Sequence, residues 1–271
     1  MNMLTNQTQT KNKSGGLFDN PIMKQLGEVK EKSENCVSYK GVALKCVFFI
    51  LTIVSGVALA LLLHMLPLAN IISQDGISFN YAEAVAAAIA LGMFIVAPFV
   101  AMFAKRTIPV SGAIYCASVG YLYAFIGNLL SAVRGQIFLA MIITLALFFA
   151  IMLVYMTGRI NVNKRFSSVL RVLFITMIVS AVLLAVSYFI PGLNVASMFV
   201  ISNPLISIGL SVVGIVIVSL FLLVDFKTVK DAVDNKLPKK YEWAGAFGIM
   251  FSVIWLFIEV LSLISKVKDL G

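Results

Sequence analysis

The chain has 271 residues, of which 61% are hydrophobic and 12% are charged, and its mean hydropathy is +1.00. Average soluble domains are about 45–50% apolar and about 25% charged, so this composition excludes a soluble globular protein and indicates an integral membrane protein. The net charge is +9. Because the cations lie beside apolar runs, membrane topology explains them better than a nucleic-acid surface does. We therefore expect the lipid bilayer, and no nucleic acid, as a partner.

The chain divides into a polar tail and an apolar remainder. Residues 1–43 are polar and predict a flexible cytoplasmic tail, whereas residues 44–271 predict a transmembrane domain. In a bilayer the backbone must satisfy its own hydrogen bonds, and one helical span needs about 20 residues. The sequence therefore predicts an all-α fold with seven transmembrane helices, at 46–68, 82–104, 108–130, 137–157, 172–190, 205–224 and 243–265.

The distribution of lysine and arginine predicts the orientation. Eighteen of the 21 cationic side chains fall on one side of the predicted spans: seven in 1–45, two at 105–106, four in 159–171 and five in 227–240. Arg134, Lys266 and Lys268 fall on the other side. Cytoplasmic loops carry the excess of positive charge. Taking the membrane to be a bacterial inner (plasma) membrane, we expect an integral protein with the N-terminus cytoplasmic and the C-terminus outside.

The sequence lacks the common motifs of enzymes and metal sites. It contains no HExxH, G-x-S-x-G, P-loop, GxGxxG or GxGD motif. His64 is the only histidine, and the three cysteines at 36, 46 and 116 form no CxxC pair. We therefore expect no enzymatic activity, no cofactor and no metal site.

Ionisable residues inside apolar spans are costly and indicate function. Glu83 and His64 lie near the ends of their spans, where an interfacial charge in contact with water and a hydrogen-bonded interfacial histidine are the simplest interpretations. Asp225 ends the sixth apolar run, which places it at the inner interface by hydropathy alone. Glu259 lies deep in the seventh run and must face the interior of the bundle or a watery cavity.

Three segments resemble bacterial members of the Bax inhibitor-1 family, also called the transmembrane Bax inhibitor motif family. The strongest is LPKKYEWAGAFGIMFSVIWLFIEVLSLISK, and the others are FLLVDFKTVKD and TIPVSGAIYCASVGYLYAFIG. The resemblance implies a central seventh helix surrounded by six others, and a pH-sensitive calcium leak across the membrane. It also implies a gate made of two acids on the sixth and seventh helices, which correspond to Asp225 and Glu259. A basic residue that latches this pair corresponds to Lys105 or Arg106.

Two carboxyls in contact cannot both ionise cheaply, so a shared proton would bridge the sixth and seventh helices. Losing that proton would favour separation of the helices or attract a hard cation such as calcium, which prefers oxygen ligands. Straight antiparallel helices would, however, leave the two acids about 13 Å apart in depth. Either the connection DNKLPKK absorbs this difference or the acids act separately.

The alternative function is that of a non-catalytic regulatory protein. Some family members are understood to modulate membrane-protein quality control or the cell-death and stress machinery. The cationic tail could bind such a membrane-protein partner or an anionic lipid surface.

Overall fold

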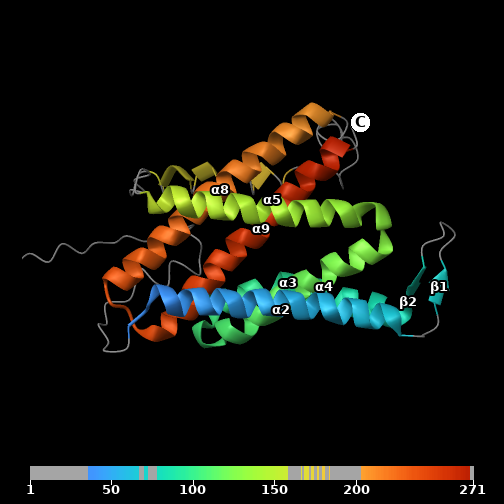
Figure 1. Cartoon of the computed structure of the whole chain (residues 1–271), viewed down its shortest axis with the longest axis horizontal. Coiled ribbons are helices and arrows are strands. Elements are labelled where there is room, and N and C mark those ends of the chain that lie inside the picture. Colours follow the sequence, from blue (N-terminus) through green and yellow to red (C-terminus); the bar gives the residue numbers. More distant parts are fainter. Residues whose placement is uncertain are drawn as a thin grey trace, which may run out of the picture.

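The computed structural model describes residues 36–66, 70–72, 78–157 and 203–268, together with scattered helical residues between 166 and 183. It is helical apart from one short hairpin, and six long helices cover most of the described chain (Figure 1). These are α2 (Tyr39–Met65), α3 (Tyr81–Phe103), α4 (Ile108–Leu129), α5 (Ser131–Met156), α8 (Pro204–Asp234) and α9 (Glu242–Lys268). The smaller elements are strands β1 (Asn70–Ile72) and β2 (Ser78–Asn80) and the 3₁₀ turns η1 (Lys105–Thr107) and η2 (Lys239–Tyr241).

Six helices of the described part are long and apolar enough to cross a bilayer. They correspond to six of the seven predicted spans, and most of the predicted fifth span, 172–190, lies outside the described residues. The predicted polar tail also lies mostly outside them, although α2 begins at Tyr39, within the range assigned to the tail. The sixth helix is longer than predicted, because α8 continues ten residues beyond Val224 to Asp234.

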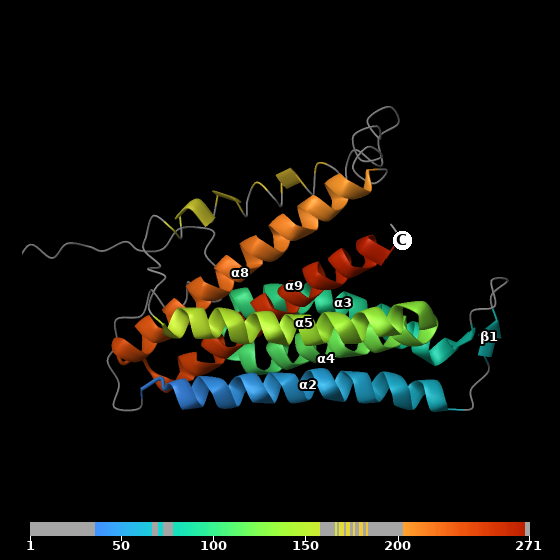
Figure 2. The same cartoon turned by 45° about the horizontal axis from the view of Figure 1, so that its top comes forward.

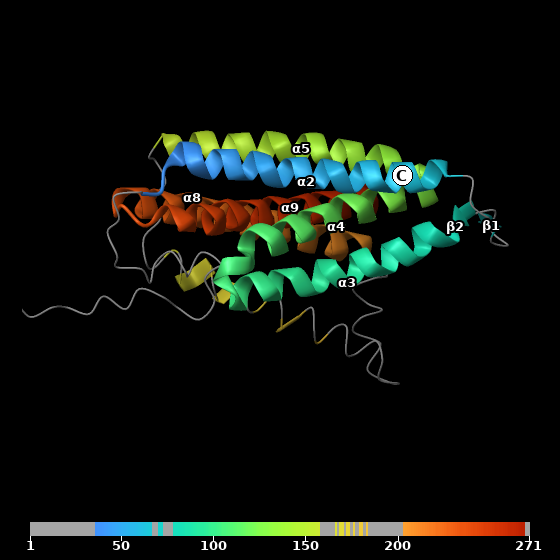
Figure 3. The same cartoon turned by 90° about the horizontal axis from the view of Figure 1, so that it is seen from below.

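The helices run roughly alongside one another and define two ends of the bundle (Figure 2). We call the end where α2 begins and where α8 connects to α9 the amino end, and the end where α9 finishes the carboxyl end (Figures 1 and 2). Helix α9 packs against α8, α2, α5 and α4. Helix α3 lies on the outer side of α4 (Figure 3).

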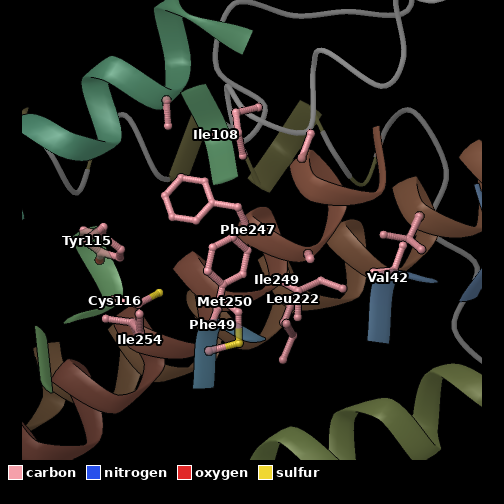
Figure 4. Packing of buried hydrophobic residues seen from close by; sticks show 14 of the residues in the cluster. Val42, Phe49, Ile108, Tyr115, Cys116, Leu222, Phe247, Ile249, Met250 and Ile254 are labelled. Carbon is pink, nitrogen blue, oxygen red and sulfur yellow. The ribbon is translucent and has the colours of Figure 1, made fainter. Parts of the chain in front are cut away.

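An aromatic cluster joins α2, α4 and α9 in the main core. The rings of Phe49 and Phe247 lie with centroids 5.7 Å apart, and Tyr115 meets Phe247 edge-on at 5.8 Å (Figure 4). Gly112 leaves the space for this contact, since a Cβ there would lie 2.8 Å from Phe49 and 2.9 Å from Phe247. The core therefore places α9 against the α2–α4 pair through ring packing.

Helices α2 and α4 approach each other at backbone distance. A Cβ on Gly56 would lie 2.0 Å from the carbonyl oxygen of Ala117, and a Cβ on Gly120 would lie 2.0 Å from that of Ile53. Small residues permit such close packing between membrane helices. Each glycine is required by the opposite backbone, so the contact is reciprocal.

The carboxyl end of α2 is tied to the start of α3 by buried polar groups. Asn80 and Glu83 form a capping box at the start of α3, and Glu83 also accepts a hydrogen bond at 2.8 Å from His64 Nδ1, if that nitrogen carries the proton. Tyr121 on α4 donates to the Glu83 carbonyl at 3.1 Å. His64 is thus hydrogen-bonded as predicted, but the prediction of a water-exposed Glu83 was wrong, because this network leaves the residue 2% exposed.

Candidate functional site between helices 8 and 9

The predicted acids lie on the two helices that form one antiparallel pair. Helix α8 runs toward the amino end, and residues 235–241 turn the chain back into α9 (Figure 1). Polar and small residues of the two helices meet at several positions along this α8–α9 seam. We call each such position a level.

The level nearest the amino end contains Asp225. This residue lies inside α8 rather than at its end and is 0% exposed. Its carboxyl oxygen Oδ2 accepts a hydrogen bond from the hydroxyl of Ser252 on α9, which is also buried. A buried carboxyl needs hydrogen-bond partners because its desolvation is otherwise costly. The contact therefore couples the state of this acid to the packing of α9 on α8.

The second acid occupies a different level of the seam. Glu259 is partly buried, and its Oε1 accepts a hydrogen bond from Trp255 Nε1 at 3.3 Å. It faces Gly214 of α8, where a Cβ would lie 2.7 Å from Glu259 Oε2. The glycine thus leaves space for the carboxylate beside the helix.

The expected carboxyl pair is not brought together. Ser252, the partner of Asp225, is seven residues before Glu259 on α9, which corresponds to about 10 Å along a helix. Gly214, which faces Glu259, is eleven residues before Asp225 on α8, or about 16 Å. The connection does not absorb the difference in depth, because only residues 235–241 join the two continuous helices, and the last three of them form the 3₁₀ turn η2. The contact that was predicted between the two acids is therefore absent, and their role in gating stays a prediction.

Apolar side chains fill the seam between the two acids. Val218 lies between Gly214 and Asp225 on α8, and Leu256 lies between Ser252 and Glu259 on α9. Both are 0% exposed and belong to one hydrophobic cluster. An apolar constriction opposes the passage of ions because it does not hold water well. The two acids are therefore separated along the seam by packed apolar side chains, which we call the apolar barrier.

The predicted latch residues lie in the turn between α3 and α4. Lys105 and Arg106 belong to η1, and Arg106 is exposed. The side chain of Lys105 is outside the described residues. The latch therefore stays a prediction.

A second polar cluster anchors the start of α9 at the amino end. Glu242 is fully buried, and its Oε1 accepts hydrogen bonds from the backbone nitrogen and the hydroxyl of Ser38, both at 3.1 Å. Its Oε2 forms an ion pair with Lys45 of α2. Nearby, the Val37 nitrogen donates to the carbonyl of Leu237 at 2.8 Å. The segment before α2 is thereby bound to the turn between α8 and α9.

Sequence reasoning missed Ser252 and Glu242 as partners of buried polar groups. Ser252 could have been found, since the expected depth difference of about 13 Å points to a position roughly nine residues before Glu259, at Met250, and Ser252 is the nearest polar residue to it. The neighbours of Glu242 in the sequence did not indicate that it is buried, because it adjoins lysines in a polar stretch that is typical of a solvated loop.

The apolar helices and the seam between α8 and α9 define a helical membrane protein with two interior acids. The family model described as Bax inhibitor 1 like matches residues 3–269. The chain therefore belongs to the Bax inhibitor-1 family and is an integral membrane protein, as its sequence motifs predicted. Neither the curated proteins nor the solved structures contain a significant match.

Proposed function

We propose that this protein is a pH-sensitive cation leak channel or transporter with calcium as its cargo, in which Asp225 and Glu259 act as two separate protonation-dependent elements. The observation that carries the proposal is the fully buried Asp225 carboxyl bound to Ser252 across the seam. The protonated carboxyl is stable in a contact between helices that excludes water, whereas the ionised carboxylate is stable only when water or a cation is bound to it. Ionisation would therefore favour hydration of the seam.

The second acid supports the same path from the opposite end. Glu259 lies on the seam toward the carboxyl end, and the apolar barrier of Val218 and Leu256 separates it from Asp225. A cation moving between these acids would leave one carboxylate, cross the barrier and reach the other. Under this proposal the barrier closes the path while Asp225 is protonated.

We further propose that the chain has seven transmembrane helices, with residues 172–190 as the additional span and α9 at the centre. The contacts of α9 with four other helices support its central position. The start of α2 and the end of α9 lie at opposite ends of the bundle, as an odd number of spans requires (Figure 2). The cationic turn at 236–240 lies at the amino end, which supports a cytoplasmic amino end in a bacterial inner membrane.

Calcium flux measured in proteoliposomes across a range of pH tests the proposal. We expect the wild-type flux to vary with pH and the variant Asp225→Asn to lose this dependence, because its amide cannot ionise. Ser252→Ala should shift the profile without removing it. Asp231→Asn is the matched control, since this acid is on the same helix but its side chain is 51% exposed.

Two results would contradict the proposal. The first is a wild-type protein that carries no calcium at any pH. The second is an unchanged pH profile in both Asp225→Asn and Glu259→Gln. The alternative regulatory function depends on the tail, most of which lies outside the described residues, and it stays a prediction along with the absence of enzymatic activity.

A further inference from the structure

The side chain of Lys266 binds oxygen atoms at the carboxyl end of the α8–α9 seam. Its ammonium donates a hydrogen bond to Ser211 Oγ at 2.6 Å and another to the carbonyl oxygen of Ser207 at 3.2 Å. Ser211 is 2% exposed. A lysine near the end of a membrane helix commonly extends toward water, whereas this one reaches across to the neighbouring helix.

Further oxygen atoms continue inward from this ammonium. Ser211 Oγ lies 3.4 Å from the hydroxyl of Ser262 on α9. Three residues before Ser262 is Glu259, whose carboxylate faces Gly214. Gly214 is itself three residues after Ser211 on α8. The two hydroxyls and the carboxylate therefore lie on neighbouring turns of the same seam, and we call them with the Ser207 carbonyl the outer oxygen cluster.

Hydroxyl, carbonyl and carboxylate oxygens are the ligands that hard cations prefer. In the structure the ammonium of Lys266 supplies the positive charge at this cluster. We propose that the outer oxygen cluster is a cation-binding site and that Lys266 is a tethered cation that occupies it in the closed state. This inference rests on the proposed function, because it makes the cluster the cation-binding site at the carboxyl end of the proposed cation path.

The charge balance explains why Lys266 would compete with a free ion. With Lys266 in place, the positive charge of its ammonium acts through space on the carboxylate of Glu259. Without it, the cluster would carry one uncompensated negative charge in a partly buried setting, where charge interactions are stronger than in water. Among the described residues no group of three His, Cys, Asp or Glu side chains could hold a metal. A site with one carboxylate suits an ion in transit rather than a permanently bound metal.

Equilibrium binding of radioactive calcium to the purified full chain in detergent tests the inference. We expect Lys266→Met to bind calcium with at least tenfold higher affinity than the wild type. Adding Glu259→Gln to this variant should remove the gain, because the carboxylate is the only charged ligand of the proposed site. Lys268→Met is the matched control: it removes the same charge from an exposed position two residues away and should leave binding as in the wild type.

Lys266→Gln provides a second variant if Lys266→Met does not fold, since its amide can still donate a hydrogen bond to Ser211. The same gain is expected, and circular dichroism verifies that each variant keeps its helices. Calcium affinity equal to that of the wild type in the folded Lys266 variants would overturn the inference. A gain that persists after Glu259→Gln, or that Lys268→Met reproduces, would also overturn it.

The binding and flux measurements separate this inference from the proposed function. If the Lys266 variant gains the calcium site but no form of the protein carries calcium across vesicles, the cation site stands and the leak function fails. If the wild type shows the expected flux and the Lys266 variants gain no site, the leak function stands and the tethered-cation inference fails.

Discussion

Replacing Glu242 by glutamine should destabilise the protein strongly, although the change removes only one charge. The carboxylate is 0% exposed and accepts three hydrogen bonds, two from Ser38 and one from Lys45. Glutamine has one acceptor oxygen in place of two, and its amide group would face the ammonium of Lys45. The variant therefore leaves a cation that is 16% exposed beside a neutral group.

The size of the effect follows from the burial of the pair. A hydrogen bond to a charged group contributes about 1.5–3 kcal/mol, and breaking a buried ion pair by removing one partner costs about 3–5 kcal/mol. Lys45 keeps some contact with water, which reduces the penalty. We therefore expect Glu242→Gln to lower the free energy of unfolding by about 2–3 kcal/mol.

The matched control is Asp231→Asn, which breaks the ion pair of Lys227 and Asp231 on the exposed part of α8. Exposed ion pairs between residues four apart on a helix contribute about 0.3–0.5 kcal/mol to the free energy of unfolding. Denaturant unfolding in detergent, followed by the fluorescence of Trp243 and Trp255, measures both effects. Trp243 lies beside the Glu242 pair, since the Lys45 ammonium is 5.1 Å from the centroid of its ring. Equal losses in the two variants would refute the reasoning that burial makes the Glu242 pair strong.

Three further predictions concern packing and the barrier. Gly56→Ala should prevent stable folding, whereas Gly209→Ala, with nothing within 4 Å of its Cβ, should be tolerated; equal yields of folded protein would contradict this. Leu256→Ser should raise calcium leak in proteoliposomes at every pH, because a hydroxyl hydrates the barrier; an unchanged leak would show that the barrier is elsewhere. Tyr121→Phe should cost about 1 kcal/mol of stability by removing the hydrogen bond to Glu83, and an unchanged unfolding midpoint would contradict it.

The sequence allowed the positions of six helices to be predicted because lipid imposes one strong requirement on the backbone. The ends of these helices were harder to predict, as α8 shows. Hydropathy reports where a helix leaves lipid, so the predicted span ended at Val224, but the helical hydrogen bonds continue through the polar residues to Asp234. A charged residue at the end of an apolar run can therefore lie inside a helix and be buried by its neighbours.

The candidate site was predicted in part. Hydropathy correctly drew attention to Asp225 and Glu259 as polar groups on the helices that form the seam. Their separation depends on the register of two helices, which the short connection between them sets. The burial of Glu83 and Glu242 was not foreseeable from their own segments, because each is covered by residues distant in the sequence, namely His64 and Tyr121 for the first and Ser38 and Lys45 for the second.

The reciprocal glycine contacts between α2 and α4 restrict how this molecule can change shape. With each backbone resting directly on the other at Gly56 and Gly120, neither helix can slide or rotate without a steric collision. We therefore expect these two helices to move together. Helix α8 meets α9 through side chains instead, among them the hydroxyl of Ser252 and the ammonium of Lys266, so a change at this seam does not require the two backbones to pass each other.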